Sequence, residues 1–348
     1  MPDKKLIVGM PAGSLANPDR GGNLIQLLEK AGFKTSGYES GGPSGFTTVN
    51  FLFGWDGRPQ EFGSQLSIGE LDVAIAGDDW IQERTLELKL EYQTELKLER
   101  VLSLNRGGVY LVGITNESRY SSTDEFLENL CRNKKIITVV SEMPYLALNW
   151  IQGSLRRINK YEDYAEFSVQ KYKTPPRIKQ GVLIYETWGK TEAKIKNGGA
   201  DLGLEITQSG SAIRNYGLTI METVLESETG IYINPDLKRN TKKLELLKMF
   251  LLNLYGVVNA ENKVMILFNV PNKNVEDIEK YLSDNLLYAD EPTKNAGKYF
   301  TEFGIQVNKD NKKQSLAVVR YELAKRGAAN IDTIPVNSSI QNIDVLDL

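Results

Sequence analysis

Apolar and polar positions alternate in short blocks through the first 80 residues, and each block has the length of one strand or helix. An apolar run over 6–10 predicts a buried strand, and apolar residues three and four apart predict a helix over 22–32 that ends at Gly32. The pattern further predicts a strand over 49–53, a helix over 60–68 and a buried strand over 71–76. Strands that alternate with helices in this way favour a parallel-rich sheet with helices on its faces.

A different pattern follows between Leu86 and Leu98, where leucines alternate with charged residues at a period of two. This period is typical of strands with one face in solvent, so we expect edge strands here and interpret the charges as a solvated face.

A second series of elements begins near residue 109. The pattern predicts strands over 109–114, 136–140 and 180–185, and helices over 121–130, 145–157 and 190–197. The stretch 161–179 mixes tyrosine and lysine without a clear period, and we interpret it as a lid or a solvated loop.

The last third of the chain starts with a polar, basic stretch over 235–243 that we interpret as a linker. Beyond it the pattern predicts helices over 244–254, 275–282 and 313–326, and strands over 263–269, 299–307 and 330–335. Apart from the leading helix, the order is βαβαβ, which is close to a ferredoxin-like domain. The pattern alone fits a small structural or dimerising domain equally well.

Composition narrows the class of protein. A chain of 348 residues predicts two or three domains, and 42 basic against 45 acidic residues, a net charge of −3, argue against nucleic acid as a partner. The single cysteine, Cys131, excludes a disulfide framework or a cysteine-based zinc site within the chain. The absence of histidine rules out Ser-His-Asp catalysis and histidine-ligated metals. Without a signal-peptide core or a membrane-spanning apolar run, we expect a cytoplasmic protein with no membrane partner.

The stretch 198–214 carries the most informative chemistry. Its residues Ser209, Gly210 and Ser211 can turn successive backbone N–H groups toward one anion, at the start of a helix near Ala212. Upstream carboxylates are placed to hold a sugar diol, so the combination indicates a phosphorylated ribose. The plainer interpretation is a strand-to-helix connection capped by serine.

Several segments of the chain resemble, in the same order, the ATP phosphoribosyltransferase family of histidine biosynthesis. They are residues 6–15, 58–62, 69–78, 139–146, 189–192, 198–214, 215–227 and 255–271. The last segment is similar to the start of the extra domain found only in the long form of that family.

The resemblance implies an α/β fold with two lobes like those of type II periplasmic binding proteins around a cleft, and a C-terminal ferredoxin-like α+β domain. It places the first catalytic lobe at 1–105 plus 211–235, the second lobe with the phosphoribosyl pyrophosphate (PRPP) loop at 106–210, and a regulatory domain at 236–348.

The implied reaction joins ATP and PRPP to give N1-(5-phosphoribosyl)-ATP and pyrophosphate, the first step of histidine biosynthesis. Adenine N1 already has a free lone pair, so this chemistry needs no histidine base; alignment and charge stabilisation suffice. The resemblance also implies Mg²⁺ on the pyrophosphate, histidine as an allosteric inhibitor and a homo-oligomer, either a dimer or a hexamer. Two alternatives stay open, a phosphoribosyltransferase of another acceptor and a non-catalytic bilobal ligand-binding or regulatory paralogue.

Carried over by position, the resemblance assigns three groups of residues and no metal ligands. The catalytic residues are Glu205, Asp201 and Glu192. The PRPP-binding residues are Glu205, Thr207, Gln208, Ser209, Gly210, Ser211 and Ala212. The ATP-binding residues are Gly13, Ser14, Leu15, Arg58, Gly77 and Asp78. Of the two acids that flank one strand, we expect Asp72 to be structural and Asp78 to point into the cleft.

The first loop departs from the family, because residues 11–15 lack the lysine usually found there. Its absence is compatible with a phosphate contact from Arg20 or Lys190 instead, with a different nucleophilic substrate, or with a paralogue that has lost activity.

Overall fold

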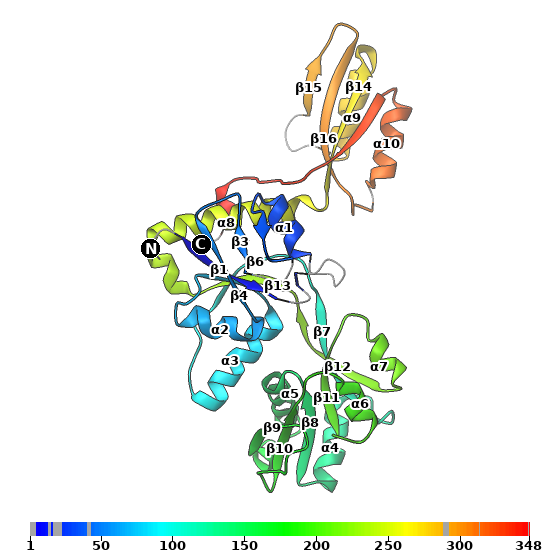
Figure 1. Cartoon of the computed structure of the whole chain (residues 1–348). Helices are drawn as coiled ribbons and strands as arrows, with labels where there is room; N and C mark the ends of the chain where they lie inside the picture. Colours follow the sequence, from blue (N-terminus) through cyan, green and yellow to red (C-terminus); the bar gives the residue numbers. More distant parts are fainter. Residues whose placement is uncertain are drawn as a thin grey trace. The chain divides into compact units, whose positions relative to one another are not determined.

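The chain forms two compact units in a computed structural model (Figure 1). The model describes residues 5–12, 15–16, 23–39, 43–287, 292–312, 314–346 and 348. The first unit contains residues 1–25, 34–247 and 348, and the second contains residues 26–33 and 248–347. No helix among the described residues is long and apolar enough to cross a membrane.

The first lobe of the first unit is built on a five-stranded sheet. Its strands, in spatial order, are β4 (Leu52–Gly57), β1 (Leu6–Pro11), β5 (Val73–Gly77), β13 (Thr229–Ile233) and β6 (Glu99–Ser103). β1 runs parallel to β4 and β5, whereas β13 is antiparallel to β5 and β6. Helix α2 (Pro59–Ser67) supplies the fully buried Phe62 and Leu66 to the core. A two-stranded ribbon, β2 (Thr35–Ser36) with β3 (Gly45–Phe46), completes this part of the chain.

The prediction of strands over 86–98 is wrong, because helix α3 spans Asp78–Tyr92. Leucine, glutamate and lysine are strong helix formers, and in a helix Leu86 and Leu90 lie four residues apart on one side. Both pack against the core of the second lobe. The helix ends at Gln93, whose φ of 52° places it in the left-handed region.

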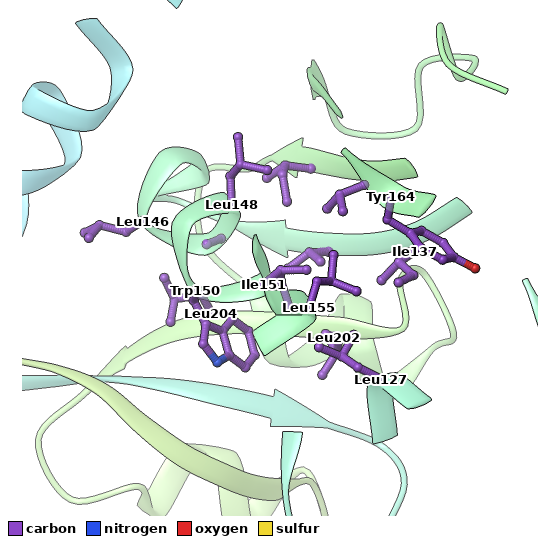
Figure 2. Close-up of a cluster of buried hydrophobic side chains, with 14 of the residues drawn as sticks. Leu127, Ile137, Leu146, Leu148, Trp150, Ile151, Leu155, Tyr164, Leu202 and Leu204 are labelled. Carbon is purple, nitrogen blue, oxygen red and sulfur yellow. The ribbon is translucent and has the colours of Figure 1, made fainter. Parts of the chain in front are cut away.

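The second lobe is built on a six-stranded sheet. Its spatial order is β12 (Thr219–Ser227), β7 (Val109–Thr115), β11 (Leu202–Thr207), β8 (Ile136–Ser141), β10 (Gly181–Glu186) and β9 (Phe167–Lys171). The last four strands are parallel, and β7 is antiparallel to both of its neighbours. Buried aliphatic side chains from these strands pack with the helices in one core, part of which is drawn in Figure 2.

Four helices accompany this sheet: α4 (Thr123–Asn133), α5 (Pro144–Arg157), α6 (Thr191–Lys196) and α7 (Ser211–Asn215). The Ser122 hydroxyl caps α4 by accepting a bond from the Glu125 amide, as expected from the helix-start residues in the sequence. α5 begins with Pro144, a residue suited to the first helical position.

Two features of the second lobe differ from expectation. The stretch 161–179 contains the 3₁₀ turn Glu162–Tyr164 and the edge strand β9, so it is neither a lid nor simply a loop. Residues 219–227, expected in the first lobe, form β12 in the second sheet. The chain passes to the second lobe between Ser103 and Val109 and returns only at Glu228, where β12 gives way to β13.

In the second unit, the segments β14 (Lys263–Pro271), α9 (Val275–Asp284), β15 (Thr293–Ala296), β16 (Phe300–Asn308), α10 (Leu316–Lys325) and β17 (Ala329–Pro335) form a ferredoxin-like fold. The sheet is antiparallel with the order β15-β16-β14-β17. Alternate residues of β14 and β16 are buried against α9 and α10. The sequence pattern missed β15, because its four residues are all exposed and lack an apolar signal.

Two helices, α1 and α8, contain points where the chain passes between the first and the second unit. α1 spans Leu24–Lys30, and Gly32 just beyond it has a φ of 85°, as predicted for a helix stop. α8 spans Thr241–Ala260 and is longer than expected, because it begins inside the predicted linker after the 3₁₀ turn Pro235–Arg239.

Candidate functional site

The parallel strands of both lobes end around one cavity of the first unit. Its volume is about 450 Å³, within the range of small-molecule sites. The lining residues are Ala12, Leu15, Arg58, Pro59, Gln60, Gly77, Asp79, Trp80, Gly107, Val109, Glu142, Ile206, Ser227 and Thr229. The last residue of β5 and residues that directly follow β1, β4 and β8 take part, as expected for an α/β sheet that binds a ligand at the carboxyl ends of its strands.

Arg58 supplies a positive charge to this cavity. It is the residue before Pro59, the first residue of α2, and its extended backbone turns the chain from β4 into that helix. Among the described residues the guanidinium forms no ion pair or hydrogen bond, and the side chain is exposed. A free arginine at this position can bind phosphate oxygens or stack on a base.

Asp79 lines the cavity, whereas the expected Asp78 does not. The Asp78 carboxylate accepts a hydrogen bond from the Tyr232 hydroxyl and lies 3.4 Å from the Arg100 guanidinium. It lines a second hollow on the side of Arg100 and Glu228. Asp78 therefore holds β5, β6 and β13 together, and the helix that begins at this position presents the next residue, Asp79, to the cavity.

Burial raises the pKa of Asp79 above its ordinary value, with the neighbouring Asp78 charge adding to the rise. Hydrogen bonds to the Trp80 amide and Ser227 act in the opposite direction. The Gly77 position is crowded, because a Cβ there would meet the Asp79 carboxylate. Only glycine allows the end of β5 to lie this close to the Asp79 side chain.

Glu205 and Glu142 lie near each other in the adjoining part of the second lobe. Both line a small hollow that also includes Ile206, and Glu142 and Ile206 reach the main cavity. Burial, together with the charges of Glu192 and Glu142, raises the pKa of Glu205 to about 7, although the Thr191 hydroxyl and the Ile206 amide act to lower it. The Ile206 amide donates to Glu205 Oε1 at 3.0 Å, and Oε2 has no hydrogen-bond partner among the described residues.

Residues 207–212 form a tight turn between β11 and α7. The Gly210 amide donates to Thr207 Oγ1 at 2.8 Å, and the Ser211 amide donates to Ser209 Oγ at 3.4 Å. Arg214 Nη2 donates to the Ser209 carbonyl at 2.6 Å. In this conformation two of the amides expected to face an anion are bonded within the turn, and the exposed Ser209, Ser211 and Ala212 form its outer surface.

Asp201 lies at the other end of β11 from Glu205. Its Oδ2 accepts from the Thr138 amide at 2.9 Å and from the Thr138 hydroxyl at 2.7 Å, and its Oδ1 pairs with Lys134. These bonds join β8 to β11 and occupy the carboxylate. The structure therefore does not bring Asp201 together with the other candidates, because Asp201 precedes the first residue of β11 and the two ends of one strand lie at opposite edges of the sheet.

The remaining candidates fall in two groups. Gly13, Ser14 and Arg20 lie outside the described residues. Glu192 is in the first turn of α6, close enough for its charge to act on Glu205, and Lys190 precedes α6 with a φ of 61°. Asp72 is structural as expected: its carboxylate accepts from the Ile7 amide and pairs with Lys243 at 2.6 Å.

Several cavity residues were missed by sequence reasoning. Trp80 and Asp79 directly follow the glycine-aspartate turn, so a helix beginning there was the signal for them. Glu142 follows β8 in a segment that was noted without a role. Gly107, Ser227 and Thr229 lie at the two lobe crossings and carry no recognisable motif.

The cavity thus places Arg58 and Asp79 of the first lobe together with Glu142 and Ile206 of the second, and Ile206 directly precedes the small-residue turn 207–212. No group of three or more acidic or cysteine side chains among the described residues is arranged to hold a metal ion. Such a site suits binding and alignment of two charged ligands, with charge stabilisation by side chains and by whatever cation the ligands bring.

Comparison with known proteins adds independent evidence. The family model for ATP phosphoribosyltransferase matches residues 58–254, more than half of the chain. The chain is 24% identical over 336 residues to "ATP phosphoribosyltransferase 1" of Geobacter sulfurreducens, covering 95% of this chain and 98% of the relative. It is 25% identical over 339 residues to the ATP phosphoribosyltransferase of Desulfosudis oleivorans, with the same coverage. Among solved structures, an ATP phosphoribosyl transferase complex from Thermotoga maritima matches with a TM-score of 0.48 at 14% identity, covering 72% of this chain and 98% of that one.

Proposed function

The chain belongs to the ATP phosphoribosyltransferase family, and from that membership we propose how its own residues perform the family's reaction. The enzyme transfers the 5-phosphoribosyl group of PRPP to N1 of ATP, giving N1-(5-phosphoribosyl)-ATP and pyrophosphate, the first step of histidine biosynthesis. What we propose is the placement of the two substrates and the role of each residue.

The observation that carries this placement is the convergence of both lobes on one cavity. ATP binds in the cavity, with its phosphates against Arg58 and its base near Trp80 and Gly77. PRPP binds at the edge of the second lobe, with its 5-phosphate on the turn 207–212 and its ribose hydroxyls against Glu205. Ile206 and Glu142 lie where the two substrates meet, because they line both the main cavity and the hollow next to Glu205.

The reaction needs alignment more than proton transfer. Adenine N1 attacks the anomeric carbon as the bond to pyrophosphate breaks, and positive charge develops on the ribose ring. Glu205 is the residue best placed to stabilise that charge, since one of its oxygens has no partner among the described side chains and burial strengthens its field. Asp79 replaces Asp78 in our assignment of the ATP site, and Asp201 is left out of the catalytic set.

Magnesium enters this scheme as part of the substrate. The described side chains do not form a three-carboxylate cage of their own, which fits an ion that arrives on the pyrophosphate oxygens of PRPP and keeps several waters.

The second unit is the proposed regulatory part of the enzyme. Its ferredoxin-like fold, residues 263–335, is separate in sequence from the cavity residues, and we propose that it responds to histidine. We retain the division into two catalytic lobes and a C-terminal domain, with β12 assigned to the second lobe. Assembly into a homo-oligomer and a cytoplasmic location also belong to this proposal.

Calorimetry on Arg58→Ala tests the placement. We expect the variant to bind PRPP as the wild type does and to bind ATP about 10-fold or more weakly, the effect of losing a charged hydrogen bond. Arg132→Ala is the matched control, because Arg132 lies on α4 with its charge on Glu128 and does not line the cavity. Loss of PRPP binding with ATP binding intact would reverse the two sites.

A further inference from the structure

A buried carboxylate joins the two lobes beside the cavity. Glu83 belongs to α3 of the first lobe and is only 6% exposed. Its Oε1 accepts from the Tyr145 amide at 3.0 Å and its Oε2 from the Leu146 amide at 2.7 Å. Both amides lie in the first turn of α5, which belongs to the second lobe.

The start of α5 depends on this contact for its capping. Met143 at the N-cap position provides no side-chain bond, and Pro144 has no N–H to donate. The next two amides of the helix would be unsatisfied in a buried position, and each would cost free energy there. Glu83 satisfies both with one negative charge, which the helix dipole also favours at this end.

The contact is part of a larger seam between α3 and α5. Trp80, Leu86 and Leu90 of α3 pack against the core of the second lobe. One turn beyond Leu86, Glu91 accepts a hydrogen bond from the Tyr145 hydroxyl at 3.2 Å. The seam therefore fixes α5 to the first lobe through apolar packing, a charged cap and a side-chain bond.

Both sides of this seam, the α3 side and the α5 side, contribute a residue to the cavity. Trp80 precedes Glu83 by three residues, about one helical turn, and lines the cavity from the first lobe. Glu142 lies two residues before α5 and lines the cavity from the second lobe. A shift of the α5 terminus relative to α3 would change the separation of these two walls.

We propose that Glu83 is a positioning residue, which clasps the start of α5 to α3 and so holds the β8–α5 turn with Glu142 at the distance that ATP and PRPP need to react. This inference rests on the proposed placement of ATP in the cavity. Glu83 itself does not line the cavity and touches neither substrate.

The electrostatic cost of burying the Glu83 carboxylate fits a role in holding the geometry of this contact. Burial, together with the nearby charges of Glu87 and Glu186, raises its pKa to about 7, although the two amides act to lower it. An apolar side chain there would avoid desolvating a charge but would leave both α5 amides unsatisfied, so the carboxylate is retained for the geometry of this contact.

The test compares Glu83→Gln and Glu83→Asp with Glu87→Gln as the matched control. Glu87 lies four residues further along α3 and pairs with Arg84 of the same helix, so its loss leaves the seam intact. Glutamine keeps the size of Glu83 but turns an N–H₂ group toward one of the two amides. Aspartate keeps the charge and shortens the reach.

For Glu83→Gln we expect a folded enzyme with PRPP affinity within about twofold of the wild type, because the PRPP residues all lie within the second lobe. We expect kcat/KM for ATP to fall about 10-fold or more, with Glu83→Asp intermediate and Glu87→Gln unchanged. Circular dichroism checks folding, calorimetry measures PRPP binding, and pyrophosphate release gives the kinetics.

The outcomes separate the two levels of the proposal. If the Arg58→Ala variant binds ATP as tightly as the wild type does, the proposed placement of ATP in the cavity is wrong. With that placement intact, wild-type kcat/KM in Glu83→Gln, or an equal loss in PRPP affinity, would overturn the positioning role. If Glu83→Gln does not fold and Glu83→Asp folds with wild-type kinetics, Glu83 is a stability residue only.

Discussion

Replacing Glu205 with glutamine should weaken the reaction and strengthen the fold, two effects of opposite sign from one atom change. Glu205 is partly buried near other acids, and one carboxylate oxygen lacks a partner among the described residues. Its charge is therefore unfavourable in the free enzyme and becomes useful only when the ribose hydroxyls and the developing positive charge of the sugar are present.

The size of the stability gain follows from the pKa. Folding raises the pKa of Glu205 from 4.5 to about 7, so the folded state binds its proton more tightly than the unfolded chain does. This contribution to stability is fully present below pH 4.5 and is lost as the pH rises through about 7. Each pKa unit is worth about 1.36 kcal/mol, which makes the wild type lose up to about 3 kcal/mol by pH 8. Glutamine avoids that loss.

The size of the kinetic penalty follows from the bond that disappears. A charge-assisted hydrogen bond to the ribose is worth about 1.5–3 kcal/mol, so kcat/KM for PRPP should fall about 10- to 150-fold. Urea unfolding at pH 5 and pH 8 measures the first effect, and pyrophosphate release at varied PRPP measures the second.

Asp201→Asn is the matched control for this prediction. Its carboxylate accepts two bonds from Thr138 and pairs with Lys134, so we expect a less stable fold at both pH values and little specific change in PRPP kinetics. If Glu205→Gln instead lowers the stability at pH 8, or leaves kcat/KM for PRPP unchanged, Glu205 is a structural residue and our reasoning about its charge is wrong.

Two further substitutions test the turn and the anchoring of α8. Gly210→Ala should lower PRPP affinity by about 10-fold or more in calorimetry, because a Cβ would come within 2.8 Å of Arg214 and 2.9 Å of Ile220. Gly198→Ala is the control, since it introduces the same backbone strain where the added Cβ meets no neighbour, and it should bind PRPP normally. Equal PRPP affinity in the two variants would refute a role for the turn. Lys243→Met should destabilise the first unit by about 3 kcal/mol in urea unfolding, because it leaves the buried Asp72 carboxylate without its cation. Lys242 is exposed, so Lys242→Met should have little effect. Unchanged stability in Lys243→Met would show that the ion pair is not needed.

The elements that sequence reasoning predicted well are those whose apolar period agrees with their final packing. The buried strands β1, β8 and β10 are continuous apolar runs, and the helix α5 carries a broad apolar face. α3 was mistaken for strands because its apolar residues serve two different neighbours, Ile81 the first-lobe core and Leu86 and Leu90 the second-lobe core, and so do not follow one helical stripe. Only the tertiary contact decides between the two periods there.

The site was predictable at the level of loops and not of single carboxylates. The sequence places Asp78 and Asp79 at the same turn, and the start of α3 decides which of them faces the cavity. Asp201 directly precedes β11 and Glu205 lies in its second half, so an offset of four residues, which looks close in sequence, places them toward opposite ends of the extended strand. The cap that Glu83 provides for α5 spans more than 60 residues of sequence and has no local signal.

The most direct test of the account mixes the intact protein with PRPP, Mg²⁺ and one of several nucleotides, and follows pyrophosphate release together with the identity of the product by NMR. We predict pyrophosphate release with ATP, a product in which the ribosyl carbon is bonded to adenine N1, and much slower release with GTP, CTP or UTP. Release that is faster with another nucleotide, or binding of PRPP and ATP with no release at all, would contradict the assignment of this cavity as the site of phosphoribosyl transfer to ATP.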